Sequence, residues 1–364
     1  MRWKKDCFAQ SFLCTFGDNY DRMVFNDEAE ESWRMKKSIS NIKKICAALA
    51  GAAVVFCCIS IAVAKFITHI RKQTLEEALA WQKEHYDTSW FDALSREIYT
   101  VQSYDGYMLH AELVRNPEET DRYVILSHGY TDNRYGNLKY MRDYLRNGYN
   151  CITYDLRGHG ENENTFCTYG KRESKDLACL IDDSFRRYGD GIELGLHGES
   201  LGAATTAAVL GLRQNVAFAV CDCGFADIMN VLQGASRKRG LPAWILQPAS
   251  AASKLVNGYA FTEMRPIDAL SDNHVPMMFI HGSEDTFILP DNSLRMNNAT
   301  AGYSEYHLIQ GAYHAQSVLT DPEQYGRLID RFLFSIHKEE KDSKAAVTAD
   351  DTAAEDGRND PAED

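Results

Sequence analysis

The chain has 364 residues, of which 45% are hydrophobic and 25% are charged, which is ample for one globular domain with additional segments. The formal net charge is −13, and we find no basic footprint and no nucleic-acid-binding motif. We therefore expect no nucleic-acid partner.

An uncharged apolar stretch of twenty residues runs from Ile45 to Ala64, after an amino-terminal segment of residues 1–44. A helix rises about 1.5 Å per residue, so this stretch would span about 30 Å, the thickness of the hydrocarbon layer of a bilayer. We expect a single transmembrane helix here. The alternatives are a buried helix and a signal peptide cleaved after Ala62-Val63-Ala64. More than forty residues precede the stretch, which argues against the signal peptide.

Positive charge is slightly heavier on the amino-terminal side of this stretch. The fifteen residues before Ile45 contain five Lys or Arg, and the fifteen after Ala64 contain three. By the positive-inside rule, residues 1–44 are expected in the cytoplasm and the rest of the chain on the outer side of the cell membrane. The ten cysteines show no regular spacing that would indicate a disulfide framework, and this weighs weakly against an oxidising exterior.

Residues 65–96 have a helical pattern, which fits either a stalk or a helix packed on the following domain. From residue 97 to 337, strand-like and helix-like segments alternate. Residues 97–103 and 107–115 flank Asp105-Gly106, a strong hairpin signal. Further strands are expected at residues 123–127, 149–154, 192–196, 216–220, 277–280 and 306–309, and helices near residues 134–147, 172–188, 203–210, 292–299 and 322–337. This order predicts an α/β domain with a mostly parallel, eight-stranded sheet and helices on both faces.

The carboxy-terminal residues 338–364 contain ten Asp or Glu and four Lys or Arg, a net charge of 4 − 10 = −6. They have almost no large apolar residues. We expect this tail to be disordered.

The sequence Gly198-Glu199-Ser200-Leu201-Gly202 stands between the apolar run 192–196 and a stretch of small residues that resembles a helix. A strand, Gly-x-Ser-x-Gly and a helix in this order are the context of a nucleophile elbow. The turn is tight, and side chains at the two glycine positions would collide with neighbouring backbone. Ser200 is therefore the candidate nucleophile.

A serine nucleophile needs a base, and the base needs a carboxylate that orients it. Asp285 follows the apolar strand near 276–280, and His314 lies in the loop after the last strand. We predict Asp285 as the acid and His314 as the base. Asp222 and Glu284 are alternative acids, and His307 is an alternative base.

The oxyanion of acyl transfer needs two preorganised N–H donors. We expect the backbone N–H groups of Leu201, directly after the nucleophile, and of Tyr130, in the loop after the strand at 123–127. His128 and Gly129 would shape that loop.

About 55 residues without a strand separate residues 216–220 from residues 277–280. We interpret residues 227–262 as a small helical cap, with Trp244, Ile245 and Leu246 as apolar walls of an acyl pocket. The alternative is an ordinary connecting helix that packs on the sheet.

These motifs together resemble serine hydrolases of the α/β-hydrolase superfamily, in the bacterial branch that includes esterases and serine-aminopeptidase-like enzymes. The matching landmarks are His128-Gly129, Tyr154-Asp155-Leu156-Arg157-Gly158-His159-Gly160, the Ser200 elbow, His281-Gly282-Ser283-Glu284-Asp285, and His314. They cover roughly residues 98–337. In the family the Asp-x-Arg-Gly-His-Gly segment is structural and borders the site, so Asp155, Arg157 and His159 are not assigned catalytic roles.

The resemblance implies a serine hydrolase of acyl esters or related carbonyl substrates, and the apolar stretch from Ile45 to Ala64 adds the expectation that it is anchored in a membrane. The sequence shows no metal or nucleotide site, so we expect no cofactor and no metal. If the protein is an enzyme, thioesterase and serine-aminopeptidase-like activities are the alternatives. A non-catalytic binding protein on the same scaffold is a further alternative, against which the complete set of Ser200, Asp285 and His314 argues.

Overall fold

The computed structural model describes residues 6–69 and 71–338. The chain divides into two units, residues 1–60 and residues 61–364, and each is described by itself. Residues 1–5 of the amino-terminal segment and residues 339–364 of the expected acidic tail lie outside the described residues.

The first unit consists of helix α1 (Asp6–Thr68), whose last turns extend into the second unit. From residue 30 to residue 59 its apolar side chains are exposed; Leu49 and Val54, for example, are 65% and 62% exposed. Within the described residues, one helical stretch, Glu30–Thr68, is long and apolar enough to cross a membrane. Length and composition are therefore consistent with the transmembrane helix expected between Ile45 and Ala64.

The second unit is built on one eight-stranded sheet with the order β1-β2-β4-β3-β5-β6-β7-β8. β1 pairs antiparallel with β2, β2 pairs antiparallel with β4, and all other neighbours are parallel. This confirms the mostly parallel sheet predicted from the sequence. The strands are β1 (Arg96–Gln102), β2 (Met108–Val114), β3 (Arg122–Ser127), β4 (Asn150–Tyr154), β5 (Glu193–Glu199), β6 (Phe218–Asp222), β7 (Met277–Gly282) and β8 (Ser304–Ile309).

Helices cover both faces of the sheet because side chains alternate between its two sides. In β3, Ile125 belongs to one buried apolar cluster, whereas Val124 and Leu126 belong to the other. Helices α4 (Glu173–Tyr188), α5 (Leu201–Val209) and α7 (Leu246–Asn257) contribute to the first cluster. Helix α3 (Leu138–Arg146) and a helix over residues 322–338 contribute to the second. The remaining helices are α2 (Leu75–His85), α6 (Ile228–Lys238), α8 (Asp291–Ala299) and α9 (Ser317–Thr320).

Two differences from the sequence-based expectation have a clear local cause. The helix expected near residues 134–147 begins as a 3₁₀ turn, Arg134–Asn137, before α3. The Asn133 side chain accepts the N–H of Tyr135 and fixes this tighter start. Strand β6 lies two residues further along than expected, because the buried Asp222 continues the pairing with β7 past the end of the apolar run.

The segment after the apolar stretch packs on the domain. Ala64, Ile67 and Thr68 are almost completely buried. The backbone N–H of Cys167 donates to the Thr68 oxygen at 3.1 Å. Helix α2 begins with a capping box at Thr74 and continues the contact through buried residues. Residues 61–85 thus belong to the folded body of the second unit.

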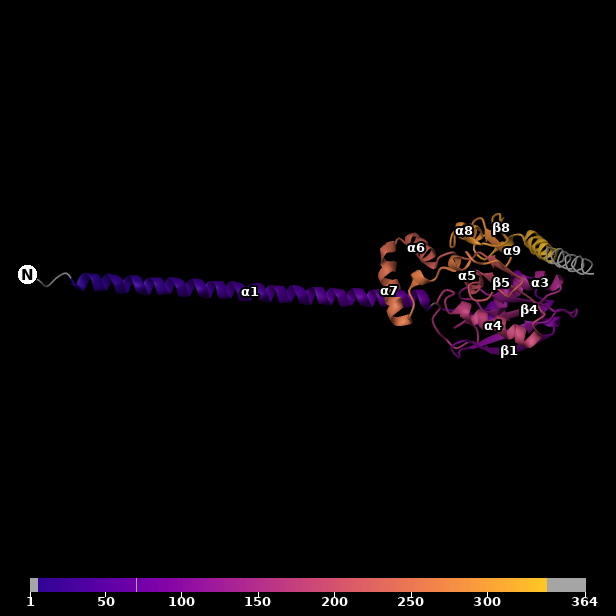
Figure 1. Cartoon of the computed structure of the whole chain (residues 1–364), viewed down its shortest axis with the longest axis horizontal. Coiled ribbons are helices and arrows are strands. Elements are labelled where there is room, and N and C mark those ends of the chain that lie inside the picture. The colour runs from indigo at the N-terminus through magenta and orange to yellow at the C-terminus, as the bar shows by residue number, and fades with distance from the viewer. Residues whose placement is uncertain (1–5, 70, 339–364) are drawn as a thin grey trace, which may run out of the picture. The chain divides into compact units, whose positions relative to one another are not determined.

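The stretch expected to form a cap contains α6, a 3₁₀ turn at Ala243–Ile245, and α7, which ends at Gly258 in the left-handed conformation (φ 78°). In Figure 1, α6 and α7 lie at one end of the body and the carboxy-terminal helix, in yellow, at the other.

Candidate active site

Ser200 lies at the sharp turn between β5 and α5 and has a left-handed backbone conformation, φ 54° and ψ −110°. This conformation is costly for a residue with a side chain and is held by its surroundings. The Ser200 N–H donates to the Asp222 carbonyl oxygen at 2.8 Å, which ties the turn to β6. The structure therefore has the strained turn that the Gly-x-Ser-x-Gly sequence predicts.

The two glycines of the elbow are required by close backbone contacts. A Cβ atom at Gly198 would lie 2.2 Å from the carbonyl oxygen of Gly202, and one at Gly202 would lie 2.0 Å from that of Ser127. Both neighbours are backbone atoms, which cannot rotate away as a side-chain end can. Helix α5 can therefore approach β3 closely only with glycine at residue 202.

We expect Gly202→Ala to destabilise the protein by about 3 kcal/mol or more, since the new methyl group overlaps fixed backbone. The matched control is Gly234→Ala in α6, where a Cβ would meet nothing within 4 Å. That change should leave stability unaltered or raise it by up to about 1 kcal/mol, because alanine is the better helix former. Thermal unfolding of the two variants checks this; equal midpoints would contradict the steric account.

His314 connects Ser200 to Asp285. Ser200 Oγ lies 2.9 Å from His314 Nε2, and His314 Nδ1 lies 2.7 Å from Asp285 Oδ2. The loop after β8 carries His314, and the turn after β7 carries Asp285. Because these strands are parallel neighbours, their carboxyl ends meet at the edge of the sheet where Ser200 also lies. The structure thus brings the three predicted residues together.

Asp285 is completely buried and held by several donors. Its Oδ1 accepts the backbone N–H groups of Phe287 and Ile288 at 2.8 and 3.0 Å. His281 Nε2 lies 3.1 Å from Asp285 Oδ2 and 2.8 Å from the Ile288 carbonyl oxygen, two acceptors that require Nε2 to carry a proton. Burial alone would raise the pKa of Asp285, but hydrogen bonds from His281 and His314 hold that pKa well below its usual range.

The alternative residues are occupied elsewhere or exposed. Asp222 accepts hydrogen bonds from Tyr140 and Ser317, and burial beside Glu199 raises its pKa to about 6. Glu284 is exposed. His307 lies within β8 and is bonded to Glu305 at 2.7 Å. Asp222 contacts Ser200 through its backbone carbonyl oxygen, but among residues 6–69 and 71–338 no side-chain hydrogen bond joins any of the three alternatives to Ser200 Oγ or to the His314 ring.

Tyr130 and Leu201 follow the carboxyl ends of neighbouring strands, β3 and β5. Leu201 is the first residue of α5, so its N–H has no acceptor within the helix. His128 Nδ1 is bonded to the Gly129 carbonyl oxygen at 2.7 Å, and His128 Nε2 accepts the N–H of Leu156 at 2.9 Å. Burial lowers the pKa of His128 to about 3, so this imidazole is neutral and stabilises the loop through its two hydrogen bonds.

A polar cluster lies beneath the elbow. Glu199 forms an ion pair with the buried Lys139, and it accepts a hydrogen bond from Tyr140 at 2.5 Å. Lys139 also donates to the carbonyl oxygen of Ala315, the residue after His314, at 3.4 Å. Lys139 therefore connects α3, the elbow and the histidine loop. This role cannot be recognised from the sequence, because a lone lysine in a helix gives no signal of burial.

Arg157 lies in the segment after β4 and is completely buried. It binds Asp176 at 2.5 Å and Asp105 at 2.9 Å. Asp155 in turn binds the buried Arg134 at 2.5 Å. These pairs fasten the segment to α4 and to the β1–β2 hairpin, which is a structural role.

The three predicted pocket residues differ in exposure. Leu246 is buried, Ile245 is half-buried against the core, and Trp244 is 62% exposed. A cavity of about 170 Å³ reaches His314. Within the described part of the chain its wall is formed by α2, by Lys139 of α3, by Glu199 of β5 and by loops, and none of the three predicted pocket residues lines it. The pocket role of Trp244, Ile245 and Leu246 stays a prediction.

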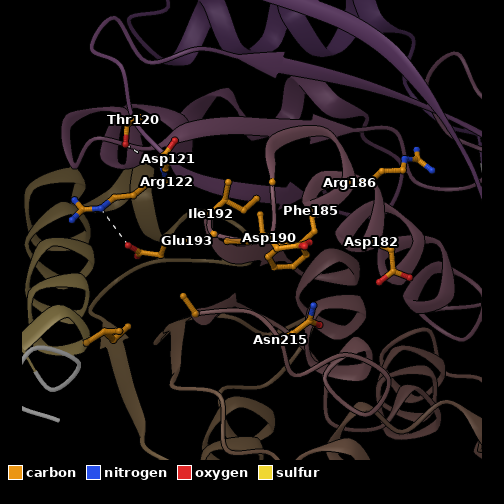
Figure 2. Close-up of a pocket in the computed structure, with 15 residues that line it drawn as sticks. Thr120, Asp121, Arg122, Asp182, Phe185, Arg186, Asp190, Ile192, Glu193 and Asn215 are labelled. Atoms are coloured by element: carbon orange, nitrogen blue, oxygen red, sulfur yellow. Dashed lines mark hydrogen bonds and ion pairs between the residues drawn. The ribbon is translucent and has the colours of Figure 1, made fainter. Parts of the chain in front are cut away.

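A larger groove of about 1430 Å³ lies at the other edge of the sheet (Figure 2). It contains Arg122 and Glu193, the first residues of β3 and β5, joined by an ion pair of 3.2 Å. Ser200 follows the opposite, carboxyl end of β5. This groove is therefore separate from the candidate active site.

Comparison with known proteins agrees with this geometry. Residues 137–317 match the model of the prolyl oligopeptidase family. The uncharacterised protein YqkD of Bacillus subtilis is 28% identical over 300 residues, covering 80% of this chain and 97% of that protein.

Among solved structures, an esterase of Pyrococcus furiosus, Pf2001, superposes with a TM-score of 0.56 at 21% identity, covering 68% of this chain and 94% of that one. A puromycin-hydrolyzing peptidase of Mycobacterium tuberculosis superposes with a TM-score of 0.52 at 18% identity, covering 66% of this chain and 39% of that one. At these identities the likeness concerns the fold.

The family match, the sheet order and the elbow define an enzyme class. The chain is a serine hydrolase of the α/β-hydrolase superfamily.

Proposed function

We propose that Ser200, His314 and Asp285 form a catalytic triad that hydrolyses acyl esters or related carbonyl substrates through an acyl-enzyme. The observation that carries this proposal is the continuous chain of hydrogen bonds from Ser200 Oγ through both nitrogens of His314 to Asp285. Asp285, kept ionised, holds the His314 tautomer in which Nδ1 carries the proton. Nε2 is then free to accept the proton of Ser200.

The reaction proceeds in two acyl transfers. Ser200 Oγ attacks the carbonyl carbon while its proton passes to His314 Nε2. His314 then gives this proton to the leaving group, and the bond between the carbonyl carbon and the leaving group breaks. A water molecule then attacks the carbonyl carbon of the acyl-enzyme while its proton passes to His314 Nε2. The bond between that carbon and Ser200 Oγ breaks, His314 returns the proton to Ser200 Oγ, and the acid is released. The N–H groups of Tyr130 and Leu201 are proposed to stabilise the oxyanion in both transfers.

The bond that is cleaved is proposed to be an ester, with thioester and aminoacyl amide as the next candidates. The family match is to peptidases, and the two superposed structures are an esterase and a peptidase. The test is the kcat/KM of the full-length protein in detergent on matched ester, thioester and aminoacyl amide panels. The full chain is needed because Ala64, Ile67 and Thr68 are buried in the hydrolase domain. We expect the highest kcat/KM on the esters. A higher kcat/KM on the aminoacyl amides would mean that the protein is a peptidase and not an esterase.

We further propose that residues 45–64 anchor the enzyme in the cell membrane, with the hydrolase domain outside the cytoplasm. The support is the exposed apolar surface of α1 and the five-to-three charge bias. The cysteines are compatible with an oxidising exterior, because Cys151 and Cys221 are buried and burial raises the pKa of each thiol well above its usual range.

We expect the protein to stay in the membrane pellet after high-salt and high-pH washing, since a spanning helix is not held by charge. Protease added to intact cells or spheroplasts should remove the hydrolase domain. Replacing Leu49 and Val54 with lysine should release the enzyme, whereas Ile39→Lys, outside the apolar stretch, should not. Release of the unaltered protein by washing would contradict the anchor, and protection of the domain until lysis would place it in the cytoplasm.

A further inference from the structure

Helix α7 is apolar along the side that faces away from the domain. The opposite side packs on the domain and contributes Leu246, Ala249 and Ala252 to the first buried apolar cluster. The outer side, with the 3₁₀ turn that leads into the helix, carries four apolar residues at intervals of four, three and four, which are Trp244, Pro248, Ala251 and Leu255. This spacing forms one stripe along a helix, called here the outer stripe. Pro248 is half-buried and the other three are exposed, Leu255 at 83%. A surface helix ordinarily has polar residues along this line, so the outer stripe suits contact with an apolar phase.

The segment around the outer stripe is basic, although the chain as a whole is acidic. Residues 228–262 contain four Lys or Arg and no Asp or Glu, in a chain that has 52 acidic residues. Arg237 and Arg239, at the end of α6, are exposed and form no ion pair within the part of the chain that the structure describes. Exposed apolar side chains bordered by cations are complementary to the surface of an anionic phospholipid bilayer.

The cap lies beside the residues that lead out of the proposed anchor. The Cys167 N–H donates to the carbonyl oxygen of Thr68, at the end of α1, at 3.1 Å. The Cys167 carbonyl oxygen accepts the hydroxyl of Tyr259, just after α7, at 2.8 Å. Thr68 is four residues beyond Ala64, the last residue of the apolar stretch, which is about 6 Å along a helix. The short connection keeps the cap within reach of the bilayer surface.

We propose that the outer stripe and the basic residues beside it form a surface that docks on an anionic phospholipid bilayer next to the anchor. Trp244 and Leu255 enter the boundary between headgroups and acyl chains, and Arg237 and Arg239 contact headgroup phosphates. Two copies of the chain meeting through this surface would bring like charges together, which favours the bilayer over self-association. The proposal rests on the proposed membrane anchor, because the anchor holds the bilayer close to the cap.

The test uses the full-length protein in vesicles of phosphatidylcholine and phosphatidylglycerol whose acyl chains carry bromine, which quenches tryptophan fluorescence on contact. The emission of Trp244 is the difference between the unaltered protein and Trp244→Phe. Bromine should quench about half or more of this emission, because the ring contacts acyl chains. The matched control is Trp90→Phe, since Trp90 packs against the second apolar cluster, on the other face of the sheet. The emission of Trp90 should be unchanged by bromine.

A charge placed in the outer stripe should undock the cap. Leu255→Asp should abolish the quenching of Trp244, because a carboxylate enters the acyl-chain region only at high cost. Leu255 is 83% exposed, so the fold should be retained. Leu212→Asp, at an exposed leucine outside the cap, should leave the quenching unchanged. Combining Arg237→Gln with Arg239→Gln, or using phosphatidylcholine alone, should lower the quenching.

Flotation of vesicles without bromine, in a density gradient at high pH, distinguishes failure of the docking surface from failure of the anchor. If the protein floats with the vesicles but bromine does not quench Trp244, or quenches it equally in Leu255→Asp, the docking surface is overturned and the anchor stands. If the protein does not float, the anchor is overturned and the docking surface with it. An unquenched Trp244 emission that moves to shorter wavelength as the ratio of protein to lipid rises would mean that copies of the chain cover the stripe, which also overturns the proposal.

Discussion

Replacing Ser200 with alanine should lower the rate of ester hydrolysis by about 10⁶-fold while the fold is retained. The alanine removes the only atom of this residue that bonds to His314, and with it the covalent route. Turnover of the full-length variant in detergent, read beside its thermal unfolding midpoint, measures the effect. The matched control is Ser335→Ala, since Ser335 is half-buried in the carboxy-terminal helix and its hydroxyl donates to the Arg331 carbonyl oxygen.

A loss below about tenfold in a folded Ser200→Ala variant would mean that another group attacks the substrate. If the unfolding midpoint of Ser200→Ala falls together with its activity, lost stability would explain the loss of activity. In that case Ser200→Cys is the second variant to measure. The thiol keeps a nucleophile at the same place, so this variant should form an acyl-enzyme from activated esters at a reduced rate.

Asp285→Asn should lower kcat by about 10⁴-fold, because an amide that donates to His314 would favour the wrong tautomer. The native carboxylate accepts from His314 Nδ1 at 2.7 Å and from two backbone N–H groups. An asparagine oxygen can still accept the backbone pair, so the turn after β7 is expected to survive. Steady-state kinetics with activated esters measures the loss.

Asp222→Asn is the control for this prediction. Asp222 is also a buried carboxyl group near the elbow, but its partners are Tyr140 and Ser317 and its pKa is raised to about 6. Because neither carboxyl oxygen of Asp222 is bonded to His314, a neutral amide at this position should lower activity by less than tenfold. If Asp222→Asn lost more activity than Asp285→Asn, the orienting acid would lie after β6.

The predictable part of this molecule is the part that depends on local rules. The alternation of apolar and polar residues indicates the sheet. Two glycines at positions where a side chain would collide with backbone indicate the elbow. Asp285 and His314 were predictable because parallel strands deliver the residues that follow them to one edge. The expectation of an amino-terminal membrane anchor rests on the length of one uncharged run, and the anchor stays a proposal.

The parts that the sequence did not indicate depend on distant contacts. His281 belongs to one of the landmarks of the superfamily resemblance, but nothing in the sequence indicates that its proton on Nε2 helps to keep Asp285 ionised. Residues 65–96 fitted a stalk and a packed helix equally well, because the partners of α2 lie some 50 residues further along the chain; Gln82, for example, binds Gly136. Trp81 carried no signal that it would line the site.

The central claim, that Ser200 attacks the substrate, is tested most directly by trapping the covalent intermediate. The full-length protein is treated with a fluorophosphonate and digested, and the modified peptide is located by mass spectrometry. The account predicts one phosphonylated residue, Ser200, with labelling lost in Ser200→Ala and strongly slowed in His314→Ala. Labelling of another serine, or undiminished labelling of Ser200→Ala, would contradict it.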